Sequence, residues 1–245
     1  MDEQFIRTRM LLGDGAMARL QAAHVAVFGL GGVGSWCAEA LCRSGVGELT
    51  LVDQDTVSVS NLNRQAAALH STVGMDKTQA TAQRLADIAP GCVLHPIAAR
   101  YEAAHREDFF QARYDYLVDA IDLVSCKLDL IETAHTRGIP SISALGTGNK
   151  RDAQQLRIAD ISQTEGCPLA RVVRKELRKR GISHHKVVFS PELARSAENG
   201  DEAPPPGRRS IPASAMWVPA AAGLLLAQAV ILDLADGQGD GPTPS

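Results

Sequence analysis

The chain has 245 residues, of which 45% are hydrophobic and 22% are charged, values typical of a globular protein. This length is enough for one well-buried α/β domain and too short for two large ones. The formal net charge of -3 excludes a general electrostatic attraction to nucleic acid, so any such partner requires a local basic patch.

Apolar runs alternate with helical patterns through the first two-thirds of the chain. The predicted elements are strands at about 24–28, 48–53, 93–97, 116–120 and 139–144, and helices at 34–44, 76–88 and 124–137. This alternation is typical of a parallel sheet whose strands are joined by helical crossovers. We therefore expect a Rossmann-like α/β fold, with a mainly parallel sheet in the N-terminal half and helices on both faces.

The pattern changes after Gly148, where the sheet is expected to become mixed or antiparallel. The predicted elements there are strands at 154–160 and 186–190, a basic helix at 168–180 and a mobile loop at about 192–209. The loop is inferred from three consecutive prolines and several charges. We expect residues 1–245 to form a single domain.

The apolar segment Pro219–Leu232 is the only candidate for a membrane span. It runs roughly 14 residues and contains Gln228, whereas a spanning helix needs roughly 20 apolar residues. A buried core helix is therefore predicted, with no integral membrane association. Residues Met1 to Gln4 lack the basic and apolar regions of a signal peptide, so a cytoplasmic location is expected.

The five cysteines are scattered and never form a C-x-x-C pair: Cys37, Cys42, Cys92, Cys126 and Cys167. This favours reduced thiols in a cytoplasmic protein, and no structural zinc is expected. Cys37 and Cys42 fall within a predicted packed helix and are expected to be inert. Cys167 begins the basic helix, where a thiol pKa is lowered, but a structural turn residue is favoured over a nucleophile or sulfur acceptor.

The run 25–28 opens into a G-x-G-x-x-G turn formed by Gly29, Gly31 and Gly34, with Gly32 between them. Such glycines allow a tight turn, close approach of the backbone to phosphate and packing of helix on strand. The following helix directs free N–H groups at an anion. Asp53 lies at the end of the next strand, where a carboxylate binds ribose hydroxyls. Together these residues predict a nucleotide site.

Further polar residues follow Asp53 and could reach a triphosphate: Asp55, Asn61, Asn63 and Arg64. Lys77 begins the predicted helix 76–88, where a cation opposes the helix dipole unless it serves an anion nearby. Asp119 and Asp122 follow the strand 116–120, at the carboxyl edge where ligands of α/β sheets bind. A carboxylate beside phosphates implies Mg²⁺, and we assign the metal to Asp122 and a structural role to Asp119.

In this order, G-x-G-G-V-G-S, D-x-D, S-N-L-N-R-Q, G-x-x-K and D-A-I-D resemble the ubiquitin-activating superfamily. That superfamily includes the bacterial adenylyltransferases of molybdopterin and thiamine biosynthesis. The segments 146–150, 167–171 and 208–212 resemble its tRNA threonylcarbamoyladenosine dehydratase branch. The resemblance extends from about Phe5 to Leu234.

The resemblance implies an ATP-dependent enzyme that activates the carboxylate of threonylcarbamoyladenosine, beside the tRNA anticodon, and cyclises it with loss of water. It implies that Asp53 binds ribose, that Asn63, Arg64 and Lys77 neutralise the triphosphate, and that Asp122 holds Mg²⁺. It also implies a homodimer in which an N-terminal arginine reaches the partner's site, Arg7 fitting best and Arg9 being a close rival. The choice between adenylation and phosphorylation stays open.

Two other expectations concern partners. The alternative function is activation of the C-terminus of a sulfur-carrier or ubiquitin-like protein. Enzymes that do this commonly carry two C-x-x-C pairs for zinc, which are missing from this sequence. A cysteine desulfurase or sulfur-acceptor partner is also considered.

The tRNA is expected to contact a basic patch on and around the helix 168–180, through phosphate contacts that position it without specifying a base. The candidates are Lys150, Arg151, Arg171, Arg174, Lys175, Arg178, Lys179, Arg208 and Arg209. Trp217 and Phe189 are predicted to pack in the core rather than against a base. His184 and His185 are interpreted as basic surface.

Overall fold

A computed structural model of the chain describes residues 3–195 and 213–237. Its seven-stranded sheet has the order β3-β2-β1-β4-β5-β7-β6, and only the β6–β7 pair is antiparallel. The strands are β1 (His24–Phe28), β2 (Glu48–Val52), β3 (Val93–Ile97), β4 (Tyr116–Asp119), β5 (Ser141–Ala144), β6 (Arg157–Asp160) and β7 (Lys186–Phe189). This confirms the predicted Rossmann-like fold with a mixed C-terminal half. Most of the predicted mobile loop, 196–209, lies outside the described residues.

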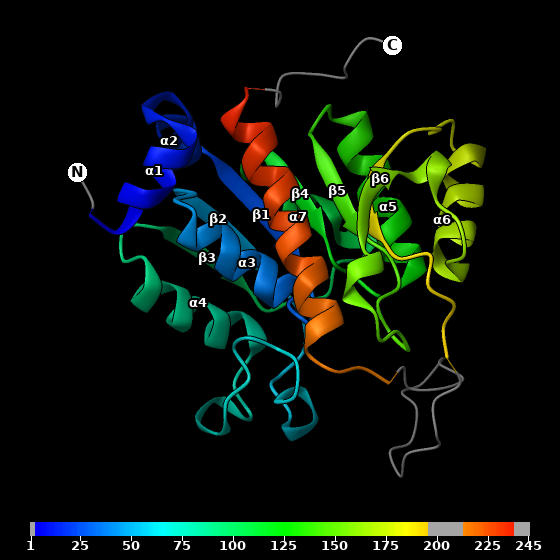
Figure 1. Cartoon of the computed structure of the whole chain (residues 1–245), viewed down its shortest axis with the longest axis horizontal. Coiled ribbons are helices and arrows are strands. Elements are labelled where there is room, and N and C mark those ends of the chain that lie inside the picture. Colours follow the sequence, from blue (N-terminus) through cyan, green and yellow to red (C-terminus); the bar gives the residue numbers. More distant parts are fainter. Residues whose placement is uncertain (1–2, 196–212, 238–245) are drawn as a thin grey trace.

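Seven α-helices surround the sheet in the described part of the chain (Figure 1). They are α1 (Ile6–Leu12), α2 (Asp14–Ala22), α3 (Gly34–Arg43), α4 (Lys77–Ile88), α5 (Val124–Thr136), α6 (Pro168–Lys179) and α7 (Trp217–Ala235). The sequence patterns did not predict α1 or α2. Helix α1 buries none of its residues, and its apolar side chains Ile6, Met10 and Leu11 are exposed.

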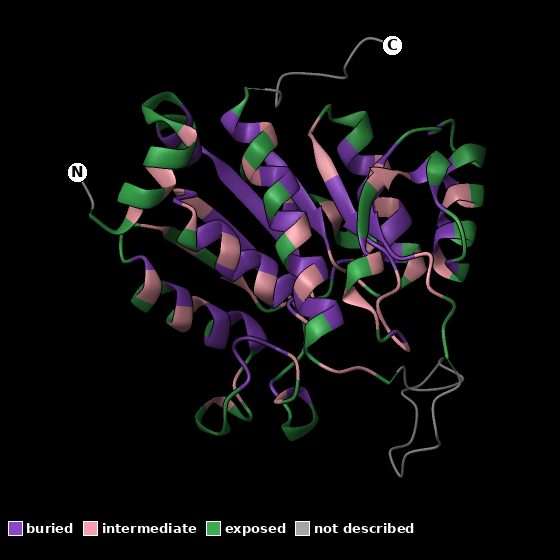
Figure 2. Ribbon diagram, in the orientation of Figure 1, coloured by how far each residue is buried: buried purple, intermediate pink, exposed green. Residues whose placement is uncertain are grey.

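Both faces of the sheet are covered, as predicted. On one face, β1, β2, β4 and β5 pack against residues of α2, α3, α4 and α7 in the largest apolar cluster. On the other face, two smaller clusters involve α5, α6 and the 3₁₀ segment η4 (Ala103–Phe109). Figure 2 shows β1 and β4 buried at the centre of these layers.

Helix α7 is long and apolar enough to cross a membrane by length and composition, yet 61% of that stretch is buried inside the fold. It packs against α3, where Gly223 permits close approach because a Cβ there would lie 2.4 Å from the Val33 carbonyl oxygen. The prediction of a core helix is therefore confirmed. This contact also supports the beginning of α3, which follows the glycine-rich turn.

The interpretation of His185 as basic surface is wrong. It directly precedes β7 and is buried, and its Nε2 is 2.8 Å from the hydroxyl of Ser143 in β5. Burial, reinforced by the positive charge of Lys127, lowers the His185 pKa to about 3, so the ring is neutral at pH 7. His184, one residue earlier, is exposed.

We expect His185 to make the fold sensitive to acid. Its folded pKa of about 3 lies below the value of about 6.5 in an unfolded chain, so the unfolded chain binds the proton first. The free energy of unfolding should therefore fall as pH drops from about 6.5 toward 3, by at most about 1.4 kcal/mol per pH unit for this one group. Urea unfolding across this range should give a shallower pH dependence for His185→Gln. Equal slopes would contradict this assignment.

Candidate nucleotide-binding site

The sheet order places a topological switch point between β1 and β4. From β1 the chain crosses to β2 and β3 on one side, whereas β4 and β5 extend the sheet on the other. In open α/β sheets, ligands bind outside the carboxyl ends of the strands at such a point. The turn after β1 and the segment after β4 meet there and carry the predicted glycines and Asp122, whereas the other predicted nucleotide residues follow β2.

Two glycines of the turn are required by close backbone contacts. Gly29 has a φ of 90°, and a Cβ on it would lie 2.6 Å from the Ala120 carbonyl oxygen at the end of β4. A Cβ on Gly34 would lie only 1.8 Å from the Gly29 carbonyl oxygen. The turn therefore packs closely between the end of β4 and the beginning of α3. As the motif predicted, Gly29 and Gly34 allow this close packing. At Gly31 a Cβ would meet nothing within 4 Å, so the turn is open on that side.

Asp53 ties the second strand to the same turn. Its Oδ2 accepts a hydrogen bond of 2.6 Å from the Leu30 backbone N–H, and its Oδ1 accepts one of 2.9 Å from the Asp55 N–H. The carboxylate is thus fixed beside the glycines while remaining partly exposed. An anchored carboxylate in this place suits recognition of ribose hydroxyls.

Lys77 and Asp55 form an ion pair across the loop that joins β2 to α4. The Lys77 Nζ lies 2.8 Å from Asp55 Oδ2, and only 9% of the lysine side chain is exposed, against 55% for the aspartate. The Lys77 backbone N–H also donates to the Asp55 carbonyl oxygen. Asp55 therefore holds the ammonium group at the carboxyl edge.

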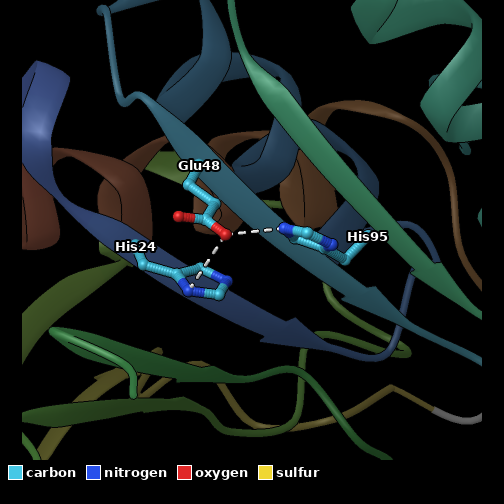
Figure 3. A group of neighbouring side chains, drawn as sticks. All are labelled: His24, Glu48 and His95. Atoms are coloured by element: carbon cyan, nitrogen blue, oxygen red, sulfur yellow. Dashed lines mark hydrogen bonds and ion pairs between the residues drawn. The ribbon is translucent and has the colours of Figure 1, made fainter. Parts of the chain in front are cut away.

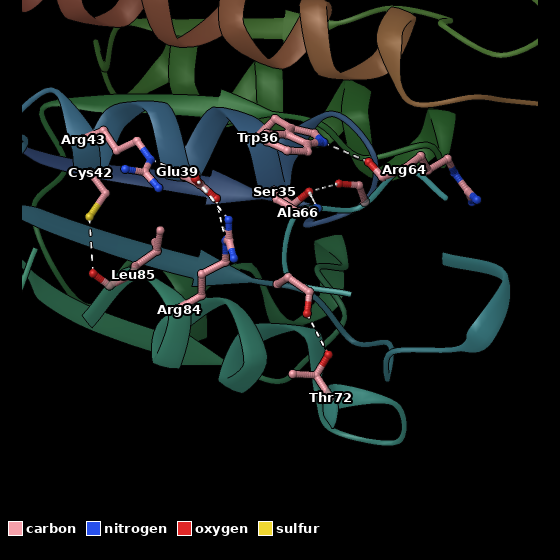
Figure 4. A network of polar contacts seen from close by, with 12 residues as sticks. Ser35, Trp36, Glu39, Cys42, Arg43, Arg64, Ala66, Thr72, Arg84 and Leu85 are labelled. Carbon is pink, nitrogen blue, oxygen red and sulfur yellow. Dashed lines mark hydrogen bonds and ion pairs between the residues drawn. The ribbon is translucent and has the colours of Figure 1, made fainter. Parts of the chain in front are cut away.

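Arg64 lies over the glycine turn. A Cβ on Gly32 would be 3.3 Å from Arg64 Cγ, and the Trp36 indole N–H of α3 donates to the Arg64 carbonyl oxygen at 2.9 Å (Figure 4). Ser35 adds a second tie, since its hydroxyl donates to the Gly31 carbonyl oxygen and accepts from the Ala66 N–H. Ser35 and Trp36 were not assigned roles from the sequence.

The two predicted asparagines, Asn61 and Asn63, stabilise the conformation of the loop between β2 and α4. Asn61 is buried, and its Oδ1 accepts from the Ser58 N–H at the start of the 3₁₀ turn η2 (Val59–Asn61). Asn63 Oδ1 accepts from the Arg64 guanidinium at 2.9 Å, and its amide donates to the Ser214 carbonyl oxygen. Asn63 thus restrains Arg64 and joins the loop to the segment before α7.

Asp119 and Asp122 have different environments at the end of β4. Asp119 is buried and pairs with Lys127 of α5, whose Nζ lies 2.7 Å from Oδ2. Asp122 is exposed just beyond Ala120, whose carbonyl oxygen faces Gly29. These positions agree with a structural role for Asp119. Lys127 was missed from the sequence, where the only signal was a lysine flanked by Cys126 and Leu128 in an apolar stretch.

The predicted N-terminal arginines do not reach this site within one chain. The Gln4 amide donates to the Ile88 carbonyl oxygen at the C-terminal end of α4, which lies at the amino edge of the sheet. Figure 1 accordingly shows α1 at the opposite end of the sheet from the loop between β2 and α4. Arg7 is exposed on α1, whereas Arg9 is half-buried and lies 3.7 Å from Asp14.

The predicted basic patch is smaller than the sequence indicated. Arg171, Lys175, Arg178 and Lys179 are exposed on α6, and Arg151 is also exposed. Lys150 is buried instead, because its Nζ donates to the Ser190 carbonyl oxygen at 2.7 Å, and desolvation lowers its pKa.

Other residues predicted near the substrate differ in their outcomes. Arg174 is half-buried and donates to the Thr164 carbonyl oxygen. Phe189 is buried, as predicted for a core residue, and Cys167 is buried directly before α6. Trp217 is 55% exposed, so the prediction that it packs in the core is wrong. Arg208 and Arg209 lie outside the described residues.

The sequence profile of the ThiF family matches residues 5–231. The tRNA threonylcarbamoyladenosine dehydratase of Bacillus subtilis is 41% identical over 242 residues, covering 96% of this chain and 95% of the relative. The crystal structure of the Escherichia coli tRNA N6-threonylcarbamoyladenosine dehydratase in complex with ATP is 31% identical, with a TM-score of 0.86 over 96% of this chain and 95% of that one. The AMP complex of the same enzyme gives a TM-score of 0.87 at 30% identity, over the same shares.

Proposed function

The chain belongs to the ThiF family, and from this premise we propose that it catalyses the ATP-dependent dehydration of threonylcarbamoyladenosine in tRNA. One observation carries the proposal. The glycine turn, Asp53 and Arg64 converge at the switch point of a chain that is 41% identical to a named dehydratase over 242 residues. The E. coli relative has been solved with ATP and with AMP. Binding of ATP at this edge accounts for the convergence.

The reaction that this site would support has two steps. A carboxylate oxygen of the substrate attacks the α-phosphorus of ATP, which forms an acyl-adenylate and breaks the bond to pyrophosphate. A nitrogen of the same side chain then attacks the acyl carbon, closes the ring and expels AMP. The oxygen of the lost water leaves with AMP, and the proton leaves the nitrogen. Ring closure is intramolecular, so it needs positioning rather than an enzyme nucleophile.

The cationic residues would make the first step possible. Two anions approach each other when a carboxylate attacks a triphosphate, and preplaced positive charge lowers the barrier. Arg64 lies over the glycine turn, and Asp55 holds the Lys77 ammonium at the same edge. These two side chains are proposed to neutralise the phosphates while Asp53 binds the ribose.

Magnesium is proposed as a cofactor at Asp122. The residue fits this ion because it is an exposed carboxylate at the carboxyl edge, and Mg²⁺ binds through one or two carboxylates together with phosphates and water. When bound, the ion would add positive charge beside the phosphates.

The tRNA is proposed to lie across α6. Arg171, Lys175 and Arg178 are spaced at helical intervals and exposed on the same side, which suits phosphate contacts that position a nucleic acid. The net charge of the whole chain is -3, so the positive charge on this helix is a local basic patch on an acidic protein.

The decisive test is to incubate the purified protein with ATP, Mg²⁺ and tRNA carrying threonylcarbamoyladenosine, and to weigh the nucleoside. We expect loss of the mass of one water with release of AMP. Release of ADP would replace adenylation by phosphorylation as the activating step. A nucleoside of unchanged mass under saturating ATP would overturn the dehydratase function. ATP–pyrophosphate exchange that only a small carrier protein stimulates would instead favour activation of a protein C-terminus.

We propose that the enzyme is a homodimer in which Arg7 enters the partner's site. Arg7 lies at the far edge of the sheet from its own glycine turn, so it can serve a site only in a second copy. Arg7→Ala and Arg64→Ala are each expected to be inactive alone. Mixed in equal amounts they should recover up to about a quarter of the activity per chain, because about half of the dimers are mixed and each mixed dimer has one of its two sites intact. Gel filtration checks the assembly. No recovery of activity in mixed dimers, or full activity of Arg7→Ala, would contradict the assignment to Arg7. If Arg9→Ala were inactive and recovered on mixing while Arg7→Ala stayed active, the role would belong to Arg9.

A further inference from the structure

A second polar cluster lies at the amino edge of the sheet, at the other end from the nucleotide site. It consists of His24, Glu48 and His95, which begin or lie within β1, β2 and β3 (Figure 3). The parallel register aligns His24 with Glu48, and Thr50 with His95. Glu48 and Thr50 are two residues apart, so all four side chains project from the same face of the sheet.

The ligand atoms of the three side chains converge. Glu48 Oε1 lies 2.6 Å from His95 Nε2 and 3.5 Å from His24 Nδ1, and the three groups all fall within 4.8 Å of one another. Figure 3 shows the carboxylate between the two imidazole rings. In a tetrahedral site with bonds of about 2.0–2.2 Å, ligand atoms are about 3.3–3.5 Å apart. The His24–Glu48 separation already has that value, and the half-exposed His95 side chain would have to move away from Glu48 to reach it.

A network behind His24 orients its ring. The His24 Nε2 lies 2.8 Å from the Thr50 hydroxyl, and the Tyr114 ring packs edge-on against the His24 ring with centroids 4.8 Å apart. Tyr114 donates to the Phe109 carbonyl oxygen at 2.8 Å. When Nε2 donates to the Thr50 hydroxyl, the lone pair of His24 is on Nδ1, the nitrogen that lies 3.5 Å from Glu48 Oε1. Metal-binding histidines commonly have their second nitrogen fixed in this way.

We propose that His24 Nδ1, Glu48 Oε1 and His95 Nε2 bind a divalent transition-metal ion, with Zn²⁺ as the best fit. Two imidazoles and one carboxylate are ligands that suit Zn²⁺, whereas Mg²⁺ prefers oxygen alone. The side chains of His95 and Glu48 are 45% and 38% exposed, which leaves room for water as a fourth ligand. The site differs from the cysteine zinc ribbon that the sequence argued against.

The ion would join the beginnings of three neighbouring strands, including the edge strand β3. It lies at the opposite edge from the nucleotide residues, so its binding does not depend on ATP or on the proposed function. Binding to the folded chain alone would raise thermal stability in proportion to the logarithm of free metal.

The test uses the untagged full-length chain, stripped of metal and titrated with Zn²⁺ by calorimetry and with Co²⁺ by visible absorption. We expect one equivalent of each ion, a tetrahedral Co²⁺ spectrum and a higher melting temperature. His95→Ala and Glu48→Gln should weaken affinity by about 100-fold or more, and Thr50→Val, which leaves the ligands intact, by about 10–100-fold. The exposed positions of His95 and Glu48 make these two variants suitable for comparing folded proteins.

The matched control is His105→Ala. His105 is an exposed histidine 3.8 Å from Asp108, and no third ligand joins them among the described residues. This variant should bind Zn²⁺ as the parent does, as should Asp122→Asn at the nucleotide edge. Absence of binding by the parent, unchanged affinity in His95→Ala and Glu48→Gln, or displacement of Zn²⁺ by excess Mg²⁺ would overturn the proposal.

Discussion

Replacing Arg64 by alanine is expected to lower kcat for cyclisation of the threonylcarbamoyladenosine side chain by about 10²–10³-fold. This is the usual effect of removing a preplaced group that stabilises transition-state charge. The fold should survive, because Arg64 is only half-buried and its carbonyl oxygen, which receives the Trp36 bond, is retained. Single-turnover kinetics with saturating ATP and tRNA, followed by mass analysis of the nucleoside, measure the effect. Binding of ATP, measured separately, should weaken less than the rate.

Arg113→Ala is the matched control for this prediction. The Arg113 side chain is 90% exposed before β4, at the amino edge of the sheet, and it lies 4.0 Å from Asp115. Its removal takes away one positive charge without altering the carboxyl edge, so the rate should not change. If Arg64→Ala retained the parental rate, or if both variants slowed the reaction equally, Arg64 would have no specific role in the chemistry.

The sequence predicted the central architecture because the strands and their glycine turn have strong local signals. The residues 24–28 and 34–43 form the predicted strand and helix, and the positive φ of Gly29 explains why glycine is needed there. The sequence also placed Asp53 at the end of the strand that follows the glycine turn, and there its Oδ2 accepts the Leu30 N–H. These features depend on contacts that a short sequence window or a motif encodes.

The features that sequence reasoning missed depend on contacts between distant segments. His185 and Lys150 look like surface residues in the chain, but Ser143 and the Ser190 carbonyl oxygen satisfy them in the interior. Trp217 looks like a core residue, yet its indole N–H donates to the Arg151 carbonyl oxygen at the surface. Burial of a polar group is favourable only with such a partner, and the partner is unknown until the chain is folded.

The ion pair between Asp119 and Lys127 gives the largest expected effect on stability. Lys127→Met should lower the free energy of unfolding by about 3–5 kcal/mol, because it leaves the Asp119 carboxylate buried without its cation. The two side chains are 3% and 0% exposed, and the Lys127 Nζ also donates to the Ala144 carbonyl oxygen at 2.9 Å. Denaturant unfolding followed by circular dichroism measures the loss.

The double variant Asp119→Asn with Lys127→Met separates the charge from the packing. Asparagine keeps an oxygen to accept the Ile121 N–H, which Asp119 Oδ1 now accepts at 3.0 Å, and no buried charge remains. Removing both partners of a buried pair costs much less than removing one, so the double variant should be more stable than Lys127→Met. A double variant as unstable as the single one would show that the lysine contributes through packing alone. Because Ala120 follows Asp119 and contacts Gly29, this pair also holds β4 against the nucleotide turn.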